Sequence, residues 1–78
     1  GYYNIGSVYR EKRNIEEAIA SFQKALEINP KFAEAHYSLA VAYYEKKEFK
    51  LAIEHCDQAA KSGMLVDPKF LERLKPYR

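Results

Sequence analysis

The chain has 78 residues, of which 47% are hydrophobic and 31% are charged, and its formal net charge is +2. This composition is typical of one small, folded, soluble domain and argues against a disordered chain. Cations and anions alternate without forming a basic stripe, which excludes an ordinary nucleic-acid interface, and no apolar run is long enough to span a membrane.

Cysteine content bears on stability and on location. Cys56 is the single cysteine of the sequence, so no disulfide can form within the chain. An unpaired cysteine fits a reducing compartment, and the cytoplasm is therefore favoured as the location. A chain of this length buries only about 60–65% of the surface that its unfolded form exposes, so contact with neighbouring units is expected to support it.

Sparse glycine and proline, with abundant alanine, glutamate, lysine and leucine, predict helix throughout the chain. In chain order, helices are expected over approximately residues 2–12, 15–28, 31–46, 49–62 and 68–75.

Residues that start and stop helices set these boundaries. Asn14 is expected to cap the second helix, with Glu17 completing a capping box. Asn29 and Pro30 should end this helix and start the next one, with Asn29 as the cap and Pro30 at the first helical position. Gly63 is expected to end the fourth helix in the left-handed conformation.

The sequence repeats itself at a spacing of 34 residues. The matched pairs are Tyr3–Tyr37, Ile5–Leu39, Gly6–Ala40, Tyr9–Tyr43, Glu11–Glu45, Lys12–Lys46, Arg13–Lys47, Ile15–Phe49, Ala18–Ala52, Ile19–Ile53, Phe22–Cys56 and Ala25–Ala59. This period is typical of stacked helix pairs. Gly6, Ala18, Ala40 and Ala52 are small enough for close helix contacts, and Tyr9, Phe22, Ala25 and Tyr43 are spaced to fill the space between helices.

One segment breaks the period. The word "NPKF" at residues 29–32 returns as "DPKF" at residues 67–70, which is 38 residues later. Four extra residues have therefore entered between the fourth and fifth helices. We expect a longer loop there, with some of Met64, Leu65 and Val66 folded over the core. The fifth helix should place Phe70, Leu71 and Leu74 on its apolar side, end before Pro76, and act as a cap.

The residues in this register resemble the tetratricopeptide repeat family, and the resemblance covers essentially the whole chain. The first unit carries Gly6, Tyr9, Ala18, Phe22, Ala25 and Pro30, and the second carries Leu39, Ala40, Tyr43, Ala52 and Ala59. The resemblance implies an all-α solenoid: two helix–turn–helix units and a C-terminal capping helix in a right-handed superhelix. Repeat 1 would cover about residues 1–32, repeat 2 about 33–66 and the cap about 67–78, as one domain cut from a longer array.

Several residues depart from the family pattern. The turn within each unit usually contains glycine, whereas Arg13 and Lys47 stand there in this chain. We expect mildly strained turns or extended helix ends at both positions. Tyr2 and His36 occupy the place where the family prefers tryptophan. Cys56 replaces the aromatic residue found as Phe22, which predicts looser packing in the second unit.

No constellation of catalytic residues appears in the sequence, so no enzymatic activity, metal or cofactor is expected. His55 and Cys56 are adjacent on one helix and point about 100° apart, which is poor geometry for an activated nucleophile. His36 could join them only in a metal site that lacks a further ligand. We interpret Cys56 as a buried apolar residue, His55 as a surface residue and His36 as a partly buried packing residue.

In the family, the first helix of each unit lines a concave groove that binds peptides. The resemblance therefore implies a groove lined by the following residues: Tyr3, Ser7, Arg10, Glu34, Tyr37, Val41, Tyr44, Glu72 and Lys75. Tyr37, Val41 and Tyr44 share one stripe, and tyrosine provides large contact area at low entropic cost. In the alternative interpretation, these tyrosines are ordinary solvating residues of a repeat or contact a neighbouring repeat.

The expected partner is a protein or peptide of unknown identity. One subfamily clamps the carboxylate end of chaperone tails, but the matching places hold Tyr3, Ser7, Ser38 and Lys75, of which only the lysine fits. That partner is excluded. The main rival function is self-association, in which the exposed ends of the two units bury against another copy. An enzyme forms a third class, which no residue pattern supports.

Overall fold

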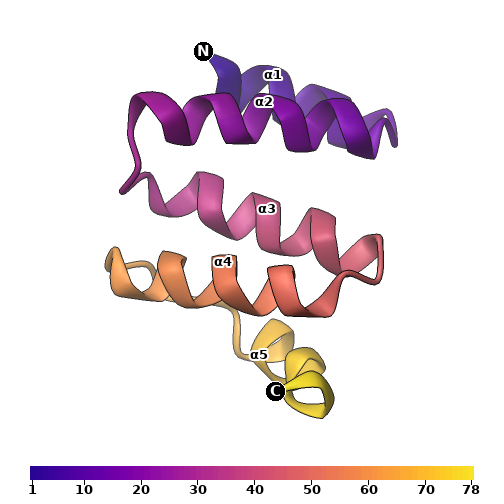
Figure 1. Cartoon of the computed structure of the whole chain (residues 1–78), viewed down its shortest axis with the longest axis vertical. Helices are drawn as coiled ribbons and strands as arrows, with labels where there is room; N and C mark the ends of the chain where they lie inside the picture. Colours follow the sequence, from indigo (N-terminus) through magenta and orange to yellow (C-terminus); the bar gives the residue numbers. More distant parts are fainter.

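The computed structural model describes all residues from 1 to 78 and contains five α-helices and no strand (Figure 1). The helices are α1 (Tyr2–Glu11), α2 (Ile15–Ile28), α3 (Ala33–Glu45), α4 (Phe49–Lys61) and α5 (Pro68–Leu74), and a short 3₁₀ turn follows at Lys75–Tyr77. The helices form two pairs, α1 with α2 and α3 with α4, and α5 follows at the C-terminal end. The expected α-solenoid of two units with a closing helix is confirmed.

The pairs stack along the longest dimension of the molecule, whose extents are 32 × 25 × 17 Å. The N-terminus lies at one end of the stack and the C-terminus at the other (Figure 1). Helix α2 packs against α3 and so joins the two units. None of the helices has the length and apolarity needed to cross a membrane.

Both turns inside the units contain a non-glycine residue in the left-handed region. Arg13 and Lys47 each have a φ of 64°. In the first turn, the N–H of Asn14 donates to the carbonyl of Tyr9 at 2.8 Å, and the second turn repeats this bond. These are Schellman endings, which normally use glycine at this position. The predicted strain at both residues is confirmed, at a cost of about 1–2 kcal/mol each.

The same turn explains why the predicted capping box is absent. Asn14 does occupy the N-cap of α2, but its side chain makes no capping hydrogen bond. Its backbone N–H is already bound to Tyr9, so it has no donor left for the carboxylate of Glu17. The capping box predicted for Asn14 and Glu17 is therefore wrong.

The core lies between the helices of each pair and between α2 and α3. Its largest fully buried side chains are Phe22, Leu39, Cys56 and Leu74. Gly6 lies so close to Phe22 that an added Cβ would be 2.7 Å from the ring. The predicted close approach at this small residue is confirmed.

The start of α3 differs from the prediction. Residues 29–32 form a turn, and the helix begins at Ala33, with Phe32 at its N-cap. Asn29 accepts a bond from the N–H of Lys31 with its side chain at 3.2 Å and from the N–H of Phe32 with its carbonyl at 3.0 Å. Asn29 is therefore not the cap of α3, and Pro30 is not its first residue.

The second copy of this word makes the same bonds and then continues as helix. Asp67 accepts from the N–H of Lys69 with its side chain at 2.9 Å and from the N–H of Phe70 with its carbonyl at 3.0 Å. Here Pro68 is the first residue of α5, because the N–H of Leu71 also donates to Asp67 at 3.2 Å. One local motif thus ends as a turn in one place and starts a helix in the other.

The phenylalanine that closes each copy makes an equivalent contact. The ring of Phe32 lies 5.0 Å from that of Tyr3, and the ring of Phe70 lies 5.5 Å from that of Tyr37. Tyr3 and Tyr37 are themselves a matched pair of the 34-residue repeat. Through its phenylalanine, each copy of the repeated four-residue motif therefore contacts the first helix of the preceding unit.

Helix α4 ends at Lys61, and Gly63 just after it has a φ of 94°, which confirms the predicted left-handed terminator. The following loop folds Val66 into the core, at 7% exposure, whereas Leu65 is 94% exposed. Phe70 and Leu74 are buried as predicted. Leu71 is 37% exposed, so its predicted place on the apolar side of α5 is wrong.

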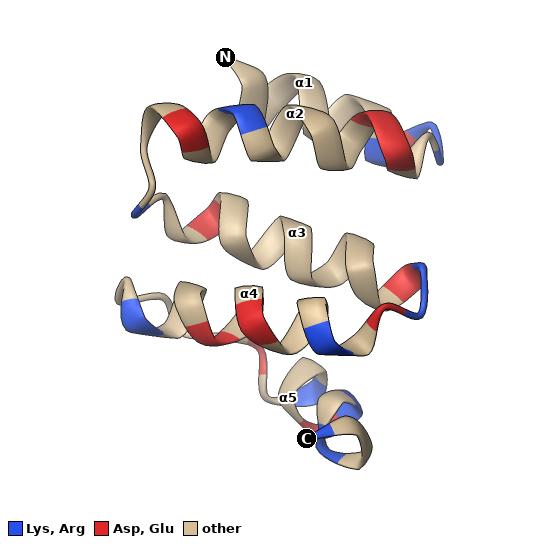
Figure 2. Cartoon of the chain, viewed as in Figure 1, with Lys and Arg blue, Asp and Glu red and all other residues tan.

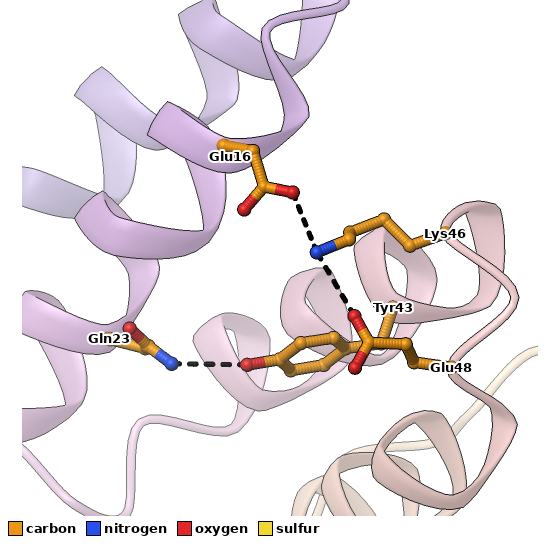
Figure 3. A network of polar contacts seen from close by, with 5 residues as sticks. All are labelled: Glu16, Gln23, Tyr43, Lys46 and Glu48. Carbon is orange, nitrogen blue, oxygen red and sulfur yellow. Dashed lines mark hydrogen bonds and ion pairs between the residues drawn. The ribbon is translucent and has the colours of Figure 1, made fainter.

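Polar contacts also connect the two units (Figure 3). The Lys46 ammonium lies 2.6 Å from a carboxylate oxygen of Glu16 on α2 and 3.0 Å from one of Glu48. Gln23 on α2 donates to the hydroxyl of Tyr43 at 3.1 Å. The two carboxylates raise the pKa of Lys46, chiefly through the hydrogen bond to Glu16. These contacts fix the orientation of α3 relative to α2.

Candidate functional site

A hollow of about 360 Å³ lies between α3 and α5, with its edge on α1. We call it the α3–α5 hollow. It is lined by Arg10, Tyr37, Ser38, Val41, Tyr44, Glu45, Asp67, Lys69, Phe70 and Arg73. Residues from three different helices and from the loop before α5 thus meet at one surface, which is the geometry expected of a binding groove.

The floor of the hollow is aromatic and apolar. Tyr37, Val41 and Tyr44 lie along α3 and are all half-buried. The rings of Tyr37 and Tyr44 meet the ring of Phe70 edge-on, at 5.5 and 5.7 Å between centroids. Because Phe70 is 4% exposed, it holds both tyrosines in place from below. The floor is therefore a pre-formed platform.

Charged side chains surround this floor. Arg10 of α1 reaches across to Glu45 of α3, with 3.6 Å between the charged atoms. Burial raises the pKa of Tyr37, and the nearby Asp67 carboxylate raises it further. Arg10 and Arg73 act on this pKa in the opposite direction. The Tyr37 hydroxyl is thus neutral and lies within the field of charges from two helices and a loop.

Four of the nine predicted groove residues line the hollow: Arg10, Tyr37, Val41 and Tyr44. The other five lie elsewhere. Tyr3 packs against Phe22 and Phe32, and the hydroxyl of Ser7 donates to the carbonyl of Tyr3 at 3.1 Å. Glu34 is exposed near the start of α3, and Glu72 and Lys75 form an exposed ion pair at 2.9 Å.

Six residues of the hollow were missed by the sequence reasoning: Ser38, Glu45, Asp67, Lys69, Phe70 and Arg73. The reason is geometric. Glu72 and Lys75 match Glu34 and Tyr37 at the 38-residue spacing, so they lie on the side of α5 that is equivalent to the groove side of α3. Across the hollow, however, α5 faces α3 with the side that carries Phe70, and not with the side that carries Glu72 and Lys75. The repeated phenylalanine was the available signal, because Phe70 marks the side of α5 that meets α3.

A second hollow of about 470 Å³ adjoins the first one and shares Arg10 and Glu45 with it. Its other lining residues are Glu11, Arg13 and Ile15, at the turn between α1 and α2. It has no aromatic residue, so it offers charge and little apolar contact area. We regard it as an extension of the α3–α5 hollow along the same side of the molecule.

The histidines and the cysteine are arranged differently from the prediction. His55 is half-buried and not a surface residue: its Nδ1 lies 3.1 Å from the Nδ1 of His36, and its ring stacks on Tyr43. His36 is buried, and its Nε2 lies 2.8 Å from the carbonyl of Pro30. No third His, Cys, Asp or Glu side chain joins the pair in a cluster that could hold a metal ion.

Cys56 is 1% exposed, as expected of a buried apolar residue. Burial raises the pKa of its thiol, and the nearby Asp57 carboxylate adds to this effect. A raised pKa keeps the sulfur protonated at neutral pH, which is the opposite of what an activated nucleophile requires.

Comparison with protein-family models gives two matches. The model described as TPR repeat matches residues 6–47, which is more than half of the chain, and the model described as Tetratricopeptide repeat matches residues 33–62. Together they cover both helix pairs.

Several curated proteins are also similar to this chain in sequence. Type IV pilus assembly protein PilF of Pseudomonas aeruginosa is 41% identical over 78% of this chain and 24% of its own length. The Hsp70-Hsp90 organising protein of Plasmodium falciparum is 26% identical over 92% of this chain and 13% of its own. A probable peptide N-acetylglucosaminyltransferase of Oryza sativa, SPINDLY, is 39% identical over 73% and 6%.

The chain spans a quarter or less of the length of each of these relatives. With two stacked pairs, a closing helix and matches to two models of one family, the chain belongs to the tetratricopeptide repeat family, whose repeats serve as protein-interaction modules.

Proposed function

We propose that the chain binds an extended segment of a partner protein in the α3–α5 hollow. The observation that carries this proposal is the floor of Tyr37, Val41 and Tyr44, held by the buried Phe70. Rigid aromatic side chains lose little entropy on binding, so a platform of this kind favours contact with a partner. Charges at the edge of the hollow would fix the position of the bound segment.

Supporting this proposal, the tyrosines of the platform do not need a partner to be stable. They pack on Phe70 and remain only partly buried, and both line the hollow. A peptide would therefore meet a surface that is already ordered, which reduces the cost of binding. The relatives named as an assembly protein and an organising protein fit a binding role of this general kind.

Self-association is a second candidate, and one observation favours it. The outer side of α1 exposes Ile5 at 47% and Val8 at 50%, and Tyr2 beside them at 41%. This apolar stripe could pack against a second copy. Phe70 and Leu74 of the cap are buried and do not form part of such a surface.

A peptide selection tests the first candidate. Peptides are selected from a displayed random library against the whole chain, and their affinities are measured by fluorescence anisotropy. Ser38 lies half-buried in the hollow, so Ser38→Trp should fill it and weaken binding of the selected peptides at least about tenfold. Gln58→Trp, on the exposed side of α4, is the matched control and should bind as the unmodified chain does.

Sedimentation separates the second candidate from the first. If peptide binding is the function, the chain sediments as a monomer at micromolar concentration. A dimer that dissociates on Ile5→Ser and Val8→Ser, together with peptide binding that Ser38→Trp leaves unchanged, would contradict the proposal and favour self-association.

A further inference from the structure

The hollow has an asymmetric charge distribution, which bears on the partner it would accept. Residues 67–78 hold four cations and two anions, a net charge of +2, so residues 1–66, with nine of each, are neutral. In Figure 2, blue segments lie on α5 and the C-terminal turn, and those elsewhere in the stack are accompanied by red ones. The excess positive charge of the whole chain therefore lies at one end of the stack.

Two of the four cations in residues 67–78 already have a carboxylate partner. Lys75 pairs with Glu72, Arg78 pairs with Asp57, and on the other side of the hollow Arg10 pairs with Glu45. Lys69 and Arg73 line the hollow, are exposed, and take part in none of the ion pairs of the structure. With Arg10 paired to Glu45, the hollow keeps Lys69 and Arg73 against the one carboxylate of Asp67, which leaves a net charge of +1.

The two cations lie four residues apart on α5, so they share one side of this helix. Like charges at this spacing repel each other, and an anion placed between them relieves the repulsion. The carboxylates of the hollow form no ion pair with these two cations. Glu45 is bound to Arg10, and an oxygen of Asp67 accepts from the backbone N–H of Lys69 at the start of α5.

Resting on the proposed binding function, we propose that the segment bound in the hollow carries acidic side chains next to apolar ones. Its apolar side chains lie on the platform of Tyr37, Val41 and Tyr44, and its carboxylates pair with Lys69 and Arg73 at the α5 edge. Platform and edge can be reached by one segment because Tyr37, Val41, Tyr44, Lys69 and Arg73 line the same hollow.

Defined peptides test this inference. The probe is a short fluorescein-labelled peptide of alternating glutamate and leucine, with its C-terminus amidated so that only side-chain carboxylates are present. Matched peptides replace glutamate by glutamine or by lysine. We expect the glutamate peptide to bind about tenfold more tightly than the glutamine peptide, and the lysine peptide to bind weakest. Raising the salt concentration should reduce this preference.

Substitutions identify the residues responsible. Lys69→Gln with Arg73→Gln should reduce the affinity for the glutamate peptide about tenfold and leave the glutamine peptide almost unchanged. Lys61→Gln with Lys24→Gln removes the same number of charges away from the hollow and is the control. Circular dichroism of each variant checks that the fold is intact.

The outcomes separate this inference from the proposed function. If the glutamine peptide binds as well as the glutamate peptide and Ser38→Trp weakens both, the hollow binds peptides but the charge preference is wrong. If only a peptide with a free C-terminal carboxylate binds, the acidic side chains are not what is recognised, and the inference is wrong. If no peptide binds, or Ser38→Trp has no effect on binding, the proposed function fails as well.

Discussion

At the scale of single residues, the structure stores strain where the chain lacks glycine. Arg13 and Lys47 adopt a φ of 64° at the turn inside each unit. Each is required by a Schellman ending that brings the second helix of the unit back along the first. The sequence pattern could predict this strain, because the family places glycine there and the chain does not.

Replacing either residue by glycine should therefore stabilise the molecule. We expect Lys47→Gly to raise the free energy of unfolding by about 0.5–1 kcal/mol, because the relief of left-handed strain exceeds the added entropy of the unfolded chain. Urea denaturation measures this change. Lys12→Gly is the control: Lys12 has a φ of −83°, so glycine there relieves nothing and should destabilise the helix end. If both substitutions changed the free energy of unfolding by the same amount, backbone strain at Lys47 would not be the cause.

The histidine pair is the other residue-scale feature, and the sequence alone could not reveal it. His36 and His55 lie 19 positions apart on neighbouring helices, and only the packing of α3 on α4 brings them together. A carbonyl can only accept, so the Nε2 of His36 carries the proton donated to Pro30. In this tautomer the Nδ1 of His36 accepts from the Nδ1–H of His55.

This pair predicts a pH-dependent stability. Burial lowers the pKa of His55 from its usual 6.5, and the neighbouring His36 lowers it further, while Glu54 acts in the opposite direction. The unfolded chain then binds a proton more readily than the folded one, so stability is complete above about pH 6.5 and declines as the pH falls below it. Thermal unfolding between pH 7 and pH 5 measures this decline. His55→Gln should flatten the curve in that window, and an unchanged slope would contradict the assignment.

At the scale of elements, close contact between α1 and α2 depends on one glycine. Gly6 faces the ring of Phe22, which is fully buried and has no free space to move into. The 34-residue match with Ala40 shows that the equivalent position in the second unit accommodates a methyl group. In the first unit, the ring of Phe22 occupies the space beside Gly6. In the second unit, the matched residue Cys56 is smaller and leaves that space open beside Ala40.

Gly6→Ala should therefore destabilise the first unit. The added Cβ would lie 2.7 Å from the ring of Phe22, so either the ring or the helix must shift. We expect a loss of about 1–3 kcal/mol in the free energy of unfolding. The double variant Gly6→Ala with Phe22→Cys copies the second unit and should not show this clash. If the alanine costs the same in both backgrounds, contact with Phe22 is not the cause.

Element boundaries show where sequence reasoning succeeded and where it could not. All five helices were predictable from composition and period, with ends within about two residues. The start of α3 was not, because "NPKF" and "DPKF" make the same local hydrogen bonds. Both phenylalanines also contact a matched tyrosine, so this contact does not decide where the helix begins. The two copies differ in the next bond: Leu71 donates to the carbonyl of Asp67 and α5 begins at Pro68, whereas α3 begins only at Ala33.

At the scale of the whole molecule, the hollow was only partly predictable. The stripe of Tyr37, Val41 and Tyr44 followed from helical spacing within one element. Lys69 and Arg73 did not, because their position depends on how α5 is rotated against α3 after the longer loop. The spacing of residues along one helix can be read from the sequence of that helix. The contact between α3 and α5, which α4 separates along the chain, cannot.

The central claim is that a partner segment lies in the α3–α5 hollow. The most direct measurement is a map of backbone amide chemical-shift changes, by NMR, when a selected peptide is added to the isotope-labelled chain. The account predicts changes that cluster at Tyr37, Ser38, Val41, Lys69 and Arg73, with little change along the outer side of α1. Changes concentrated instead at Ile5 and Val8, with the hollow unaffected, would contradict it.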